Sequence, residues 1–191
     1  MRAFLAIDIP DELKRCLTNL VSKLNPCQSS QLRPVRSNNL HITLKFLPHV
    51  AVTQIRQIVT ATSSAVSNFE SFSLDMGAIG CFPDIRNPTT LWVGIDQPNT
   101  HLQKLHIAIR NALESLGCKP ANGIYSPHIT LGRFRTKATR NQRQVILERL
   151  DYLWLPEKQS FIIDQISLVK SELNRDGAQY SLMARIPLQR S

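Results

Sequence analysis

The tetrapeptide His-Ile-Thr-Leu occurs twice in the chain, beginning at His41 and again at His128. Isoleucine, threonine and leucine favour a strand, on which successive side chains point to opposite faces. His41 and Thr43 therefore share one face, as do His128 and Thr130, while the aliphatic residues face the other way. A duplication without function could repeat these residues, but the sequence between the two copies has diverged. The repetition of both polar residues at the same spacing therefore indicates a shared chemical task.

Two imidazoles on separate strands are suited to general acid–base catalysis. The pKa of an unperturbed imidazole is about 6.5, so near neutral pH one ring can be neutral and the other protonated. One ring can remove a proton from a nucleophile while the other protonates a leaving group. Cleavage of a phosphodiester needs these two steps on opposite sides of phosphorus, and the threonine hydroxyls can donate hydrogen bonds to the phosphate. The symmetry of the motifs leaves open which histidine is the acid.

A metal site is the competing interpretation of the same histidines. Two histidines alone make a poor site, and no acidic residue stands near either motif as an obvious third ligand. His49, His101 and His106 are expected to be structural or solvent-facing, because residues five apart on a helix, such as His101 and His106, do not share a face. We therefore expect no catalytic metal and no cofactor.

The formal net charge of +9 favours partners that are rich in phosphate, nucleic acids above all. Basic residues flank both motifs: Arg33, Arg36 and Lys45 lie around the first, and Arg133, Arg135, Lys137, Arg140 and Arg143 follow the second. The cleft next to the histidines is therefore expected to be positively charged.

The composition predicts a cytoplasmic protein with no membrane segment. No apolar run approaches the roughly 20 residues that cross a bilayer, and the first apolar run is too short for a signal peptide. The four cysteines form no Cys-x-x-Cys pair, so they are expected to be reduced structural thiols; they are Cys16, Cys27, Cys81 and Cys118. Nothing indicates an obligate protein partner, and a monomer is expected.

Hydrophobic periodicity predicts a mixture of strands and helices. Strands are expected at residues 2–8, 31–36, 40–47, 72–76, 91–95, 127–134, 161–169 and 180–188. Helices are expected at residues 10–24, 53–66, 100–116 and 142–150, an irregular segment at 77–88 and a hairpin turn at 174–177. The predicted fold class is α+β, with two pseudo-symmetric lobes of antiparallel-rich sheet, helices on the outside and the active site in a central cleft. Residues 1–191 are expected to form a single domain of two interleaved lobes, each carrying one motif.

The sequence around the two motifs is similar to that of a known family. Five segments carry the likeness: RAFLAIDIPDELK, SNNLHITLKFLP, GCFPDIRNPTTLWVGID, PHITLGRF and YSLMARIPL. Together they resemble the 2H phosphoesterase superfamily, and within it the RNA 2′,3′-cyclic phosphodiesterase (2′–5′ RNA ligase) family, over nearly the whole chain.

The resemblance implies metal-independent hydrolysis of a terminal 2′,3′-cyclic phosphate of RNA to a 2′-phosphate, with reversible 2′–5′ RNA ligation as an associated activity. The expected partners are RNA 3′ ends or cyclic-phosphate nucleotides. The resemblance also implies that His41 is the proton donor to the leaving 3′-oxygen, and that His128 is the proton acceptor that activates water. Thr43 and Thr130 would bind the phosphate.

The resemblance adds Arg133 as a residue near the phosphate and Phe46 as a residue near the base. Strict alternation along a strand would put both side chains on the face opposite the histidines. They reach the site only if the strand ends twist or bulge. Otherwise Phe46 is a core residue and Arg133 is a solvated surface charge.

Two other functions stay open at the level of sequence. A phosphodiesterase or ligase acting on other 2′–5′-linked or cyclic nucleotides would use the same two histidines. A non-catalytic RNA- or nucleotide-binding module would use the same basic cleft. A pure binder would be better served by arginine and lysine than by two imidazoles that are mostly neutral at pH 7, which favours an enzyme.

Overall fold

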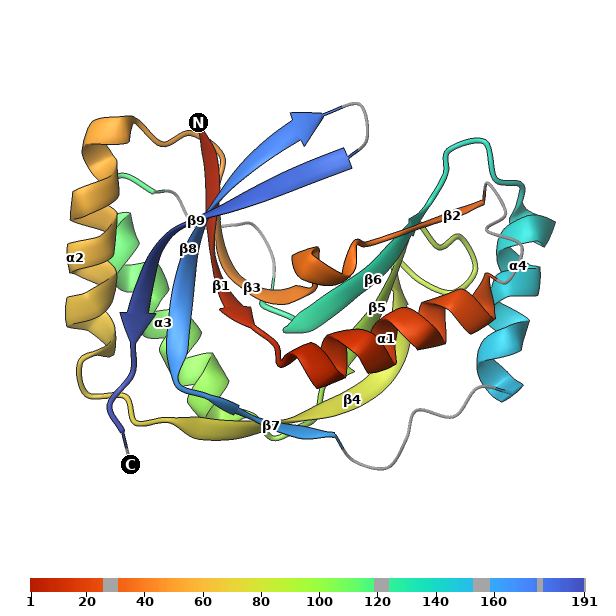
Figure 1. Ribbon diagram of the computed structural model, residues 1–191, viewed down its shortest axis with the longest axis horizontal. Helices are drawn as coiled ribbons and strands as arrows, with labels where there is room; N and C mark the ends of the chain where they lie inside the picture. Colours follow the sequence, from red (N-terminus) through yellow and green to blue (C-terminus); the bar gives the residue numbers. More distant parts are fainter. Residues whose placement is uncertain (26–30, 119–123, 153–158, 175–176, 191) are drawn as a thin grey trace.

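The computed structural model describes residues 1–25, 31–118, 124–152, 159–174 and 177–190 (Figure 1). Most of the strands join one curved sheet with the order β7-β4-β5-β6-β3-β1-β8-β9, and β2 pairs with β6. All pairings between these strands are antiparallel. The strands are β1 Arg2–Asp8, β2 Leu32–Pro34, β3 His41–Leu47, β4 Phe72–Phe82, β5 Thr90–Ile95, β6 His128–Phe134, β7 Ser160–Ile163, β8 Gln165–Asn174 and β9 Gly177–Pro187.

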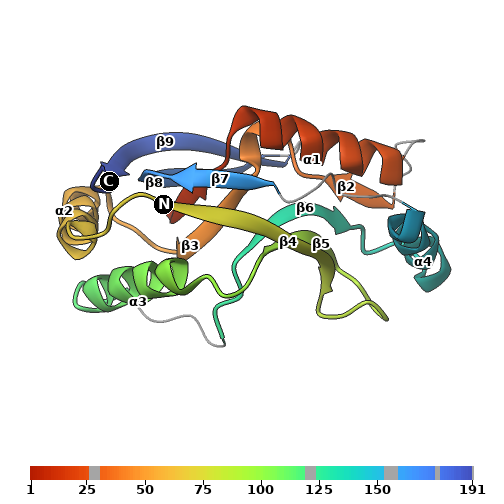
Figure 2. The ribbon, with the colours of Figure 1, turned by 90° about the horizontal axis from the view of Figure 1, so that it is seen from below.

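Helices cover the outside of this sheet, and α1 and α3 lie on opposite sides of the strands (Figure 2). The helices are α1 Asp11–Leu24, α2 Ile55–Val66, α3 Thr100–Glu114 and α4 Arg140–Glu148, with short 3₁₀ turns at Ser37–Asn39, Val52–Gln54 and Arg149–Tyr152. Helix α1 follows Pro10 and has two acidic residues in its first turn, which suits the positive end of a helix dipole. Its leucines are buried at helical spacing, as the periodicity predicted.

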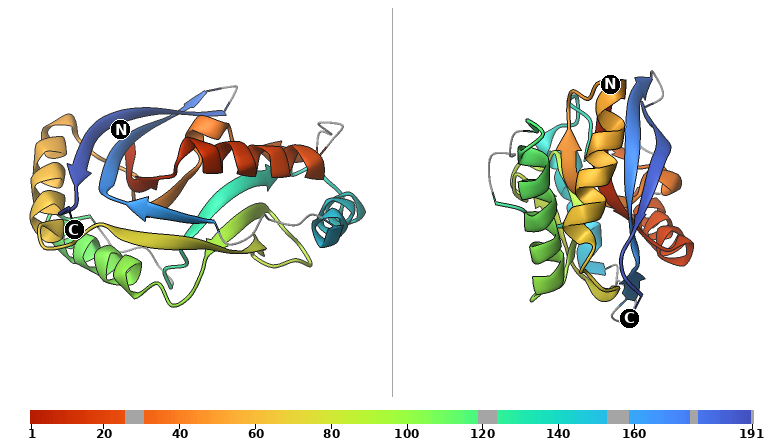
Figure 3. Two further views of the ribbon diagram at one scale, coloured as in Figure 1. Left: turned by 60° about the horizontal axis from the view of Figure 1, so that its bottom comes forward. Right: turned by 90° about the vertical axis from the view of Figure 1, so that its left-hand side faces the viewer.

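The two halves of the sheet are related by an approximate twofold arrangement. Strands β3 and β6 lie side by side in the middle, flanked by β1 and β8 on one side and by β5 and β4 on the other. Helix α1 lies in the connection from β1 to β3, and α3 lies in the matching connection from β5 to β6. Strands β7 and β8 are separated only by Asp164 but pair with opposite ends of the sheet, so the sheet curls (Figure 3, left). The predicted α+β class with two pseudo-symmetric lobes is confirmed, and we propose that the chain is a single domain.

Two predictions of local structure are wrong. Strand β4 continues through residues 77–82, which the glycines had suggested to be irregular. A Cβ at Gly80 would lie only 2.4 Å from the Trp92 ring of β5, so this glycine gives room for a neighbouring strand rather than ending its own. The strand expected at 161–169 is divided at Asp164, because β7 pairs with β4 whereas β8 pairs with β1 and β9.

Other predictions fall partly outside the described residues. Strands β8 and β9 form the expected hairpin, but residues 175–176 of its turn are not described. Cys27 also lies outside the described residues, and the three described cysteines are free thiols. Burial raises the pKa of the Cys81 thiol to about 11, as suits a structural residue. No helix in the described ranges combines the length and the apolar character needed to cross a bilayer.

Candidate active site

The two His-Ile-Thr-Leu strands meet at a single register pair. Ile42 of β3 pairs with Ile129 of β6, and both side chains are fully buried. Because the strands are antiparallel, each histidine lies across from the threonine of the other motif. The two imidazoles and two hydroxyls therefore share the face opposite the isoleucines. Residues that are far apart in the sequence are brought together in this way at the centre of the sheet.

The β3 strand bulges directly after its motif. Thr43 pairs with Ala6 of β1, and Lys45 pairs with Leu5, so Leu44 is the extra residue. Leu44 and Lys45 are both buried, and alternation resumes one position out of phase. Lys45 is only 5 % exposed, so this basic residue beside the first motif does not contribute to a charged surface.

The β6 strand carries the same bulge at the matching position. Thr130 pairs with Trp92 of β5, and Gly132 pairs with Leu91, so Leu131 is the extra residue. In both strands the burial pattern becomes buried, buried, exposed. The bulges thus turn Phe46 and Arg133 to the histidine face, where both line the cleft described below.

His41 is held in a ring of defined contacts. Its Nδ1 lies 2.7 Å from the carbonyl oxygen of Asn39, and its Nε2 lies 3.0 Å from Oγ1 of Thr43. A carbonyl oxygen can only accept, so Nδ1 carries a hydrogen and donates it. Phe4 stacks on the imidazole at 4.7 Å between ring centroids, and Tyr180 meets it edge-on at 5.6 Å. These contacts fix the ring with Nε2 beside the Thr43 hydroxyl.

His128 has a matching environment in the other half of the sheet. Its Nδ1 lies 2.8 Å from the carbonyl oxygen of Ser126, again two residues earlier, so Nδ1 is again the donor. Phe82 meets the imidazole edge-on at 4.9 Å, and Trp92 lies 6.0 Å away. In the neutral form of each ring Nε2 therefore carries the lone pair, which at His41 faces the Thr43 hydroxyl.

The electrostatic surroundings of the two histidines differ. Burial lowers the pKa of both His41 and His128 below 6.5, and a backbone carbonyl partly offsets this at each ring. Asp8 pairs with His41 across β1 and β3, and its carboxylate raises the pKa of His41. His128 has Gly94 at the equivalent place, and the Arg133 guanidinium lowers the pKa of His128. The fixed charges thus favour a cationic His41 and a neutral His128.

A cleft of about 810 Å³ opens on this face of the sheet. Five of the six site residues predicted from the sequence line it: His41, Thr43, Phe46, Thr130 and Arg133. His128 is not among the lining residues and lies beside the cleft, close enough for its charge to lower the pKa of His41. Among the described lining residues there is no aspartate or glutamate, and four are arginines: Arg2, Arg33, Arg36 and Arg133. The cleft suits a polyanion.

Sequence reasoning missed several residues of the cleft. Arg2 lies over the Phe46 ring, with its guanidinium carbon 5.5 Å from the ring centroid. Phe4 and Tyr180 surround His41, although each comes from a strand whose sequence carries no catalytic motif. The register of β1 against β3 and of β8 against β9 brings them there. Only knowledge of that register could have revealed them.

Two of the remaining histidines and one flanking arginine have structural contacts, whereas His49 is exposed. His101 stacks on Phe72 at 5.8 Å, and His106 stacks on Tyr125 at 3.8 Å. Arg143 donates to the Pro88 carbonyl at 2.8 Å, among other oxygens, and so ties α4 to a loop. Within the ranges that the structure describes, no cluster of three or more His, Cys, Asp or Glu residues could hold a metal ion.

Comparison with known proteins shows chains of similar sequence and similar fold. The chain is 30 % identical to the RNA 2′,3′-cyclic phosphodiesterase of Methanothermobacter thermautotrophicus over 183 residues, which is 96 % of each chain. It superimposes with a TM-score of 0.81 on the crystal structure of TT0787 of Thermus thermophilus, at 22 % identity, covering 100 % of this chain and 99 % of that one. It also superimposes on Escherichia coli LigT complexed with 3′-AMP, with a TM-score of 0.77 and 26 % identity, covering 98 % and 97 %.

A match to a whole family also covers most of the chain. The sequence pattern of the 2′–5′ RNA ligase superfamily covers residues 9–175, which include both His-x-Thr motifs, the two bulges and the hairpin strand β8. The chain therefore belongs to the 2′–5′ RNA ligase superfamily.

Proposed function

We propose that this protein hydrolyses the 2′,3′-cyclic phosphate at the 3′ end of RNA and leaves a 2′-phosphate. The observation that carries the proposal is the antiparallel register at Ile42 and Ile129, which sets each histidine across from the threonine of the other motif. The name of the Methanothermobacter relative supports the reaction, and the 3′-AMP complex of the related E. coli structure supports a nucleotide ligand. The arginine-rich cleft supports an RNA substrate.

Each histidine has one step in this reaction. Nε2 of neutral His128 takes a proton from water as the water oxygen attacks phosphorus. The bond from phosphorus to the 3′-oxygen breaks, and Nε2–H of protonated His41 gives its proton to that oxygen. The 2′-ester bond stays intact, so the product is a 2′-phosphate beside a free 3′-hydroxyl. Asp8 near His41 and Arg133 near His128 bias the two rings toward these protonation states.

The Thr43 hydroxyl links protonation of His41 to phosphate binding. When His41 is neutral, its Nε2 can accept only the hydroxyl hydrogen of Thr43, 3.0 Å away. Protonation of Nε2 ends that arrangement and frees the hydroxyl hydrogen for a phosphate oxygen. Thr130 and Arg133 would bind the other non-bridging oxygens, where negative charge grows in the transition state. Acid and phosphate donor thus become available together.

The same geometry allows 2′–5′ ligation. A 5′-hydroxyl in the place of water would lose its proton to His128, attack phosphorus and displace the 3′-oxygen, which forms a 2′–5′ bond. The cleft has a volume of about 810 Å³, toward the upper end of the roughly 300–1,000 Å³ usual for ligand pockets, which supports room for part of a second strand end. Because the cleft forms within one chain, we propose a monomer, and the free thiols of the described residues support a cytoplasmic location.

Hydrolysis is expected to be unaffected by chelation of divalent metals. The proposed steps transfer protons between Nε2 atoms, water and the 3′-oxygen, and none of them needs a metal. The rate on a cyclic-phosphate oligonucleotide should be measured before and after dialysis against excess EDTA. A metal-dependent nuclease in the same buffer serves as the control for complete chelation. A loss of activity that added Mg²⁺ or Zn²⁺ restores would contradict the mechanism.

Phe46→Ala is expected to raise KM by about tenfold and to change kcat less. Phe46 is 44 % exposed and lines the cleft, so the part of its ring that the Arg2 guanidinium does not cover can stack on the terminal base. Loss of one base–aromatic stack usually costs about 1–3 kcal/mol. Phe46→Trp keeps an aromatic face and should retain a KM near that of wild type. An unchanged KM in Phe46→Ala would place the base elsewhere.

A further inference from the structure

Two arginines face each other across β2 and β6. Arg33 is the register partner of Arg133, both side chains are exposed, and both line the cleft. Like charges directly opposite each other on antiparallel strands are destabilising. Neither forms an ion pair with a carboxylate among the described residues, and Arg133 only donates to the Thr90 hydroxyl, at 3.1 Å. An anion between the two guanidinium groups would remove the repulsion.

The position of Arg33 is set by the end of the β8–β9 hairpin. Gly177 has a φ of +119°, which favours glycine, and a Cβ added there would lie 2.6 Å from Nη2 of Arg33. The guanidinium therefore rests against hairpin backbone, and among the described residues it donates to no hydrogen-bond acceptor. As far as the described residues are concerned, its N–H donors are therefore open to a ligand. Arg33 thus spans from β2, on one half of the sheet, to the hairpin on the other half.

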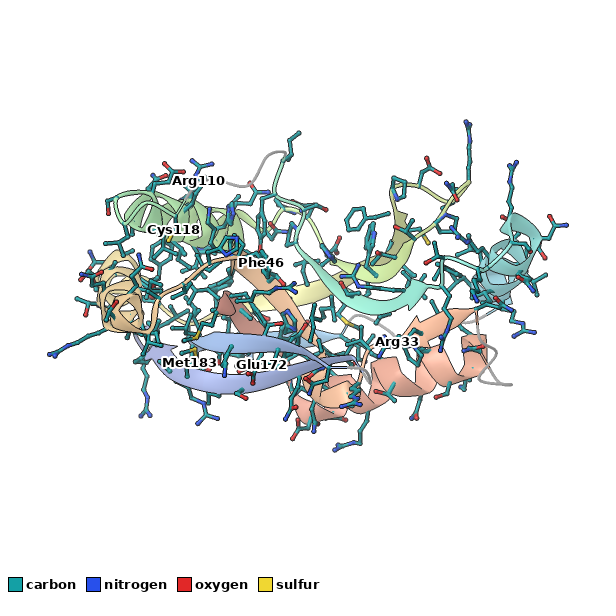
Figure 4. The ribbon with its side chains drawn as sticks, turned by 90° about the horizontal axis from the view of Figure 1, so that it is seen from above. Arg33, Phe46, Arg110, Cys118, Glu172 and Met183 are labelled. Carbon is teal, nitrogen blue, oxygen red and sulfur yellow. The ribbon has the colours of Figure 1, made fainter. Side chains whose placement is uncertain are left out.

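Arg33 lies at a distance from the proposed catalytic centre that requires a further nucleotide. On β6, Thr130 and Arg133 are three residues apart, which is roughly 7–10 Å along a bulged strand. Arg133 therefore stands between the histidine centre and Arg33. Figure 4 shows Arg33 beside β2 and well apart from Phe46, where the terminal base is proposed to stack. A cyclic mononucleotide seated at the histidines and Phe46 would leave Arg33 empty.

We propose that Arg33 binds the phosphodiester that links the terminal nucleotide to the penultimate one. This inference rests on the proposed function and makes oligonucleotides, rather than cyclic mononucleotides, the preferred substrate class. A guanidinium presents donors in a planar fork that matches two phosphate oxygens, so it suits this contact better than an ammonium group. Arg133 would face the cyclic phosphate on one side and share the charge of the next phosphate on the other.

The test compares three substrates that differ in one phosphate. They are adenosine 2′,3′-cyclic phosphate, the dinucleotide ApA with a terminal 2′,3′-cyclic phosphate, and the same dinucleotide with an uncharged methylphosphonate at its internal linkage. In the wild type, the charged dinucleotide should have a higher kcat/KM than either of the other two. Arg33→Ala should lower the ratio of kcat/KM for the charged dinucleotide over the mononucleotide by about tenfold, a usual effect of losing a charge-assisted hydrogen bond.

The methylphosphonate substrate and a matched variant complete the experiment. Arg33→Ala should discriminate much less than the wild type between the two dinucleotides, because of the two arginines near the internal phosphate only Arg133 remains. For Arg33→Ala on the charged dinucleotide, the slope of log(kcat/KM) against the logarithm of the salt concentration should be shallower than that of the wild type by about 0.7. Arg56→Ala removes the same charge from the exposed surface of α2, outside the cleft, and should leave every ratio unchanged. Arg33→Lys should recover part of the ratio.

Two outcomes would overturn the inference, and a third concerns only the function. Equal losses on mononucleotide and dinucleotide would assign Arg33 to the cyclic phosphate, and no loss on either would exclude the contact. If the wild type hydrolyses none of the three substrates, the proposed function fails. Calorimetric binding of the dinucleotide 2′-phosphate and of adenosine 2′-phosphate would then test Arg33 directly, with the same tenfold change in the ratio expected.

Discussion

Replacing either His41 or His128 by alanine is expected to lower kcat by roughly 10²- to 10⁴-fold on a cyclic-phosphate oligonucleotide. Each substitution removes one of the two proton transfers, and general acid or base catalysis typically contributes that much. The double variant should be little worse than the worse single variant, because acid and base act as a unit in one transition state. Product formation under single-turnover conditions measures the chemical step alone.

Controls separate the loss of catalysis from a loss of binding or folding. Both variants should bind the 2′-phosphate product with an affinity close to that of the wild type, since Thr43, Thr130 and Arg133 remain. His49→Ala makes the same substitution at an exposed position outside the cleft and should keep the wild-type rate. A wild-type-like rate in either site variant would refute the two-histidine mechanism. A wild type that binds RNA without turning it over would instead indicate the non-catalytic module.

Local pattern was sufficient for the parts of the site that depend on strand alternation. The residues from His41 to Leu44 could be placed on a strand, with the histidine and threonine on one face. Their residue types favour an extended backbone, in which side chains alternate between the two faces. Helix α1 was equally clear, since Pro10 and the buried leucines mark its start and its apolar face. These features need no knowledge of the partner strands, and the structure has them as expected.

The features that alternation missed depend on neighbouring strands. The bulges at Leu44 and Leu131 turn Phe46 and Arg133 onto the histidine face, and each is defined only by its pairing with β1 or β5. Nothing in the residue types marks the extra position. In the same way Gly80 looked like a strand breaker in isolation, whereas the Trp92 ring of β5 occupies the space where its Cβ would be.

The asymmetry between the two histidines also could not be obtained from the sequence. The two motifs are identical, so they cannot tell acid from base. The β1–β3 register places Asp8 next to His41, and the β5–β6 register places Gly94 next to His128. Ser167 on β8 donates to the Asp8 carboxylate at 2.6 Å and holds it in position. The difference between the rings therefore comes from their strand neighbours.

The pH dependence of kcat/KM is expected to be a bell centred below pH 6.5. In the free enzyme, burial lowers the pKa of both His41 and His128, and the midpoint of a bell is the mean of its two pKa values. Far from the midpoint the rate should fall by about tenfold per pH unit on each side, or about 100-fold over two units. In the substrate complex the anionic phosphate favours both imidazolium forms, so the bell of kcat should move to higher pH. An optimum of kcat/KM above pH 6.5 would exclude one of the two rings.

Asp8→Asn in the same experiment distinguishes acid from base. The Asp8 carboxylate raises the pKa of His41, so its loss should lower that pKa further. If His41 is the acid, kcat/KM falls at pH values above both pKa values, where the rate follows the protonated fraction of His41, and stays unchanged below both. If His41 is the base, the rate instead rises below both pKa values and stays unchanged above them. Glu114→Gln removes a carboxylate on α3, outside the cleft, and should leave the acidic and the alkaline side of the pH profile unchanged. If only Asp8→Asn shifts the profile, the side that shifts tells whether His41 is the acid or the base.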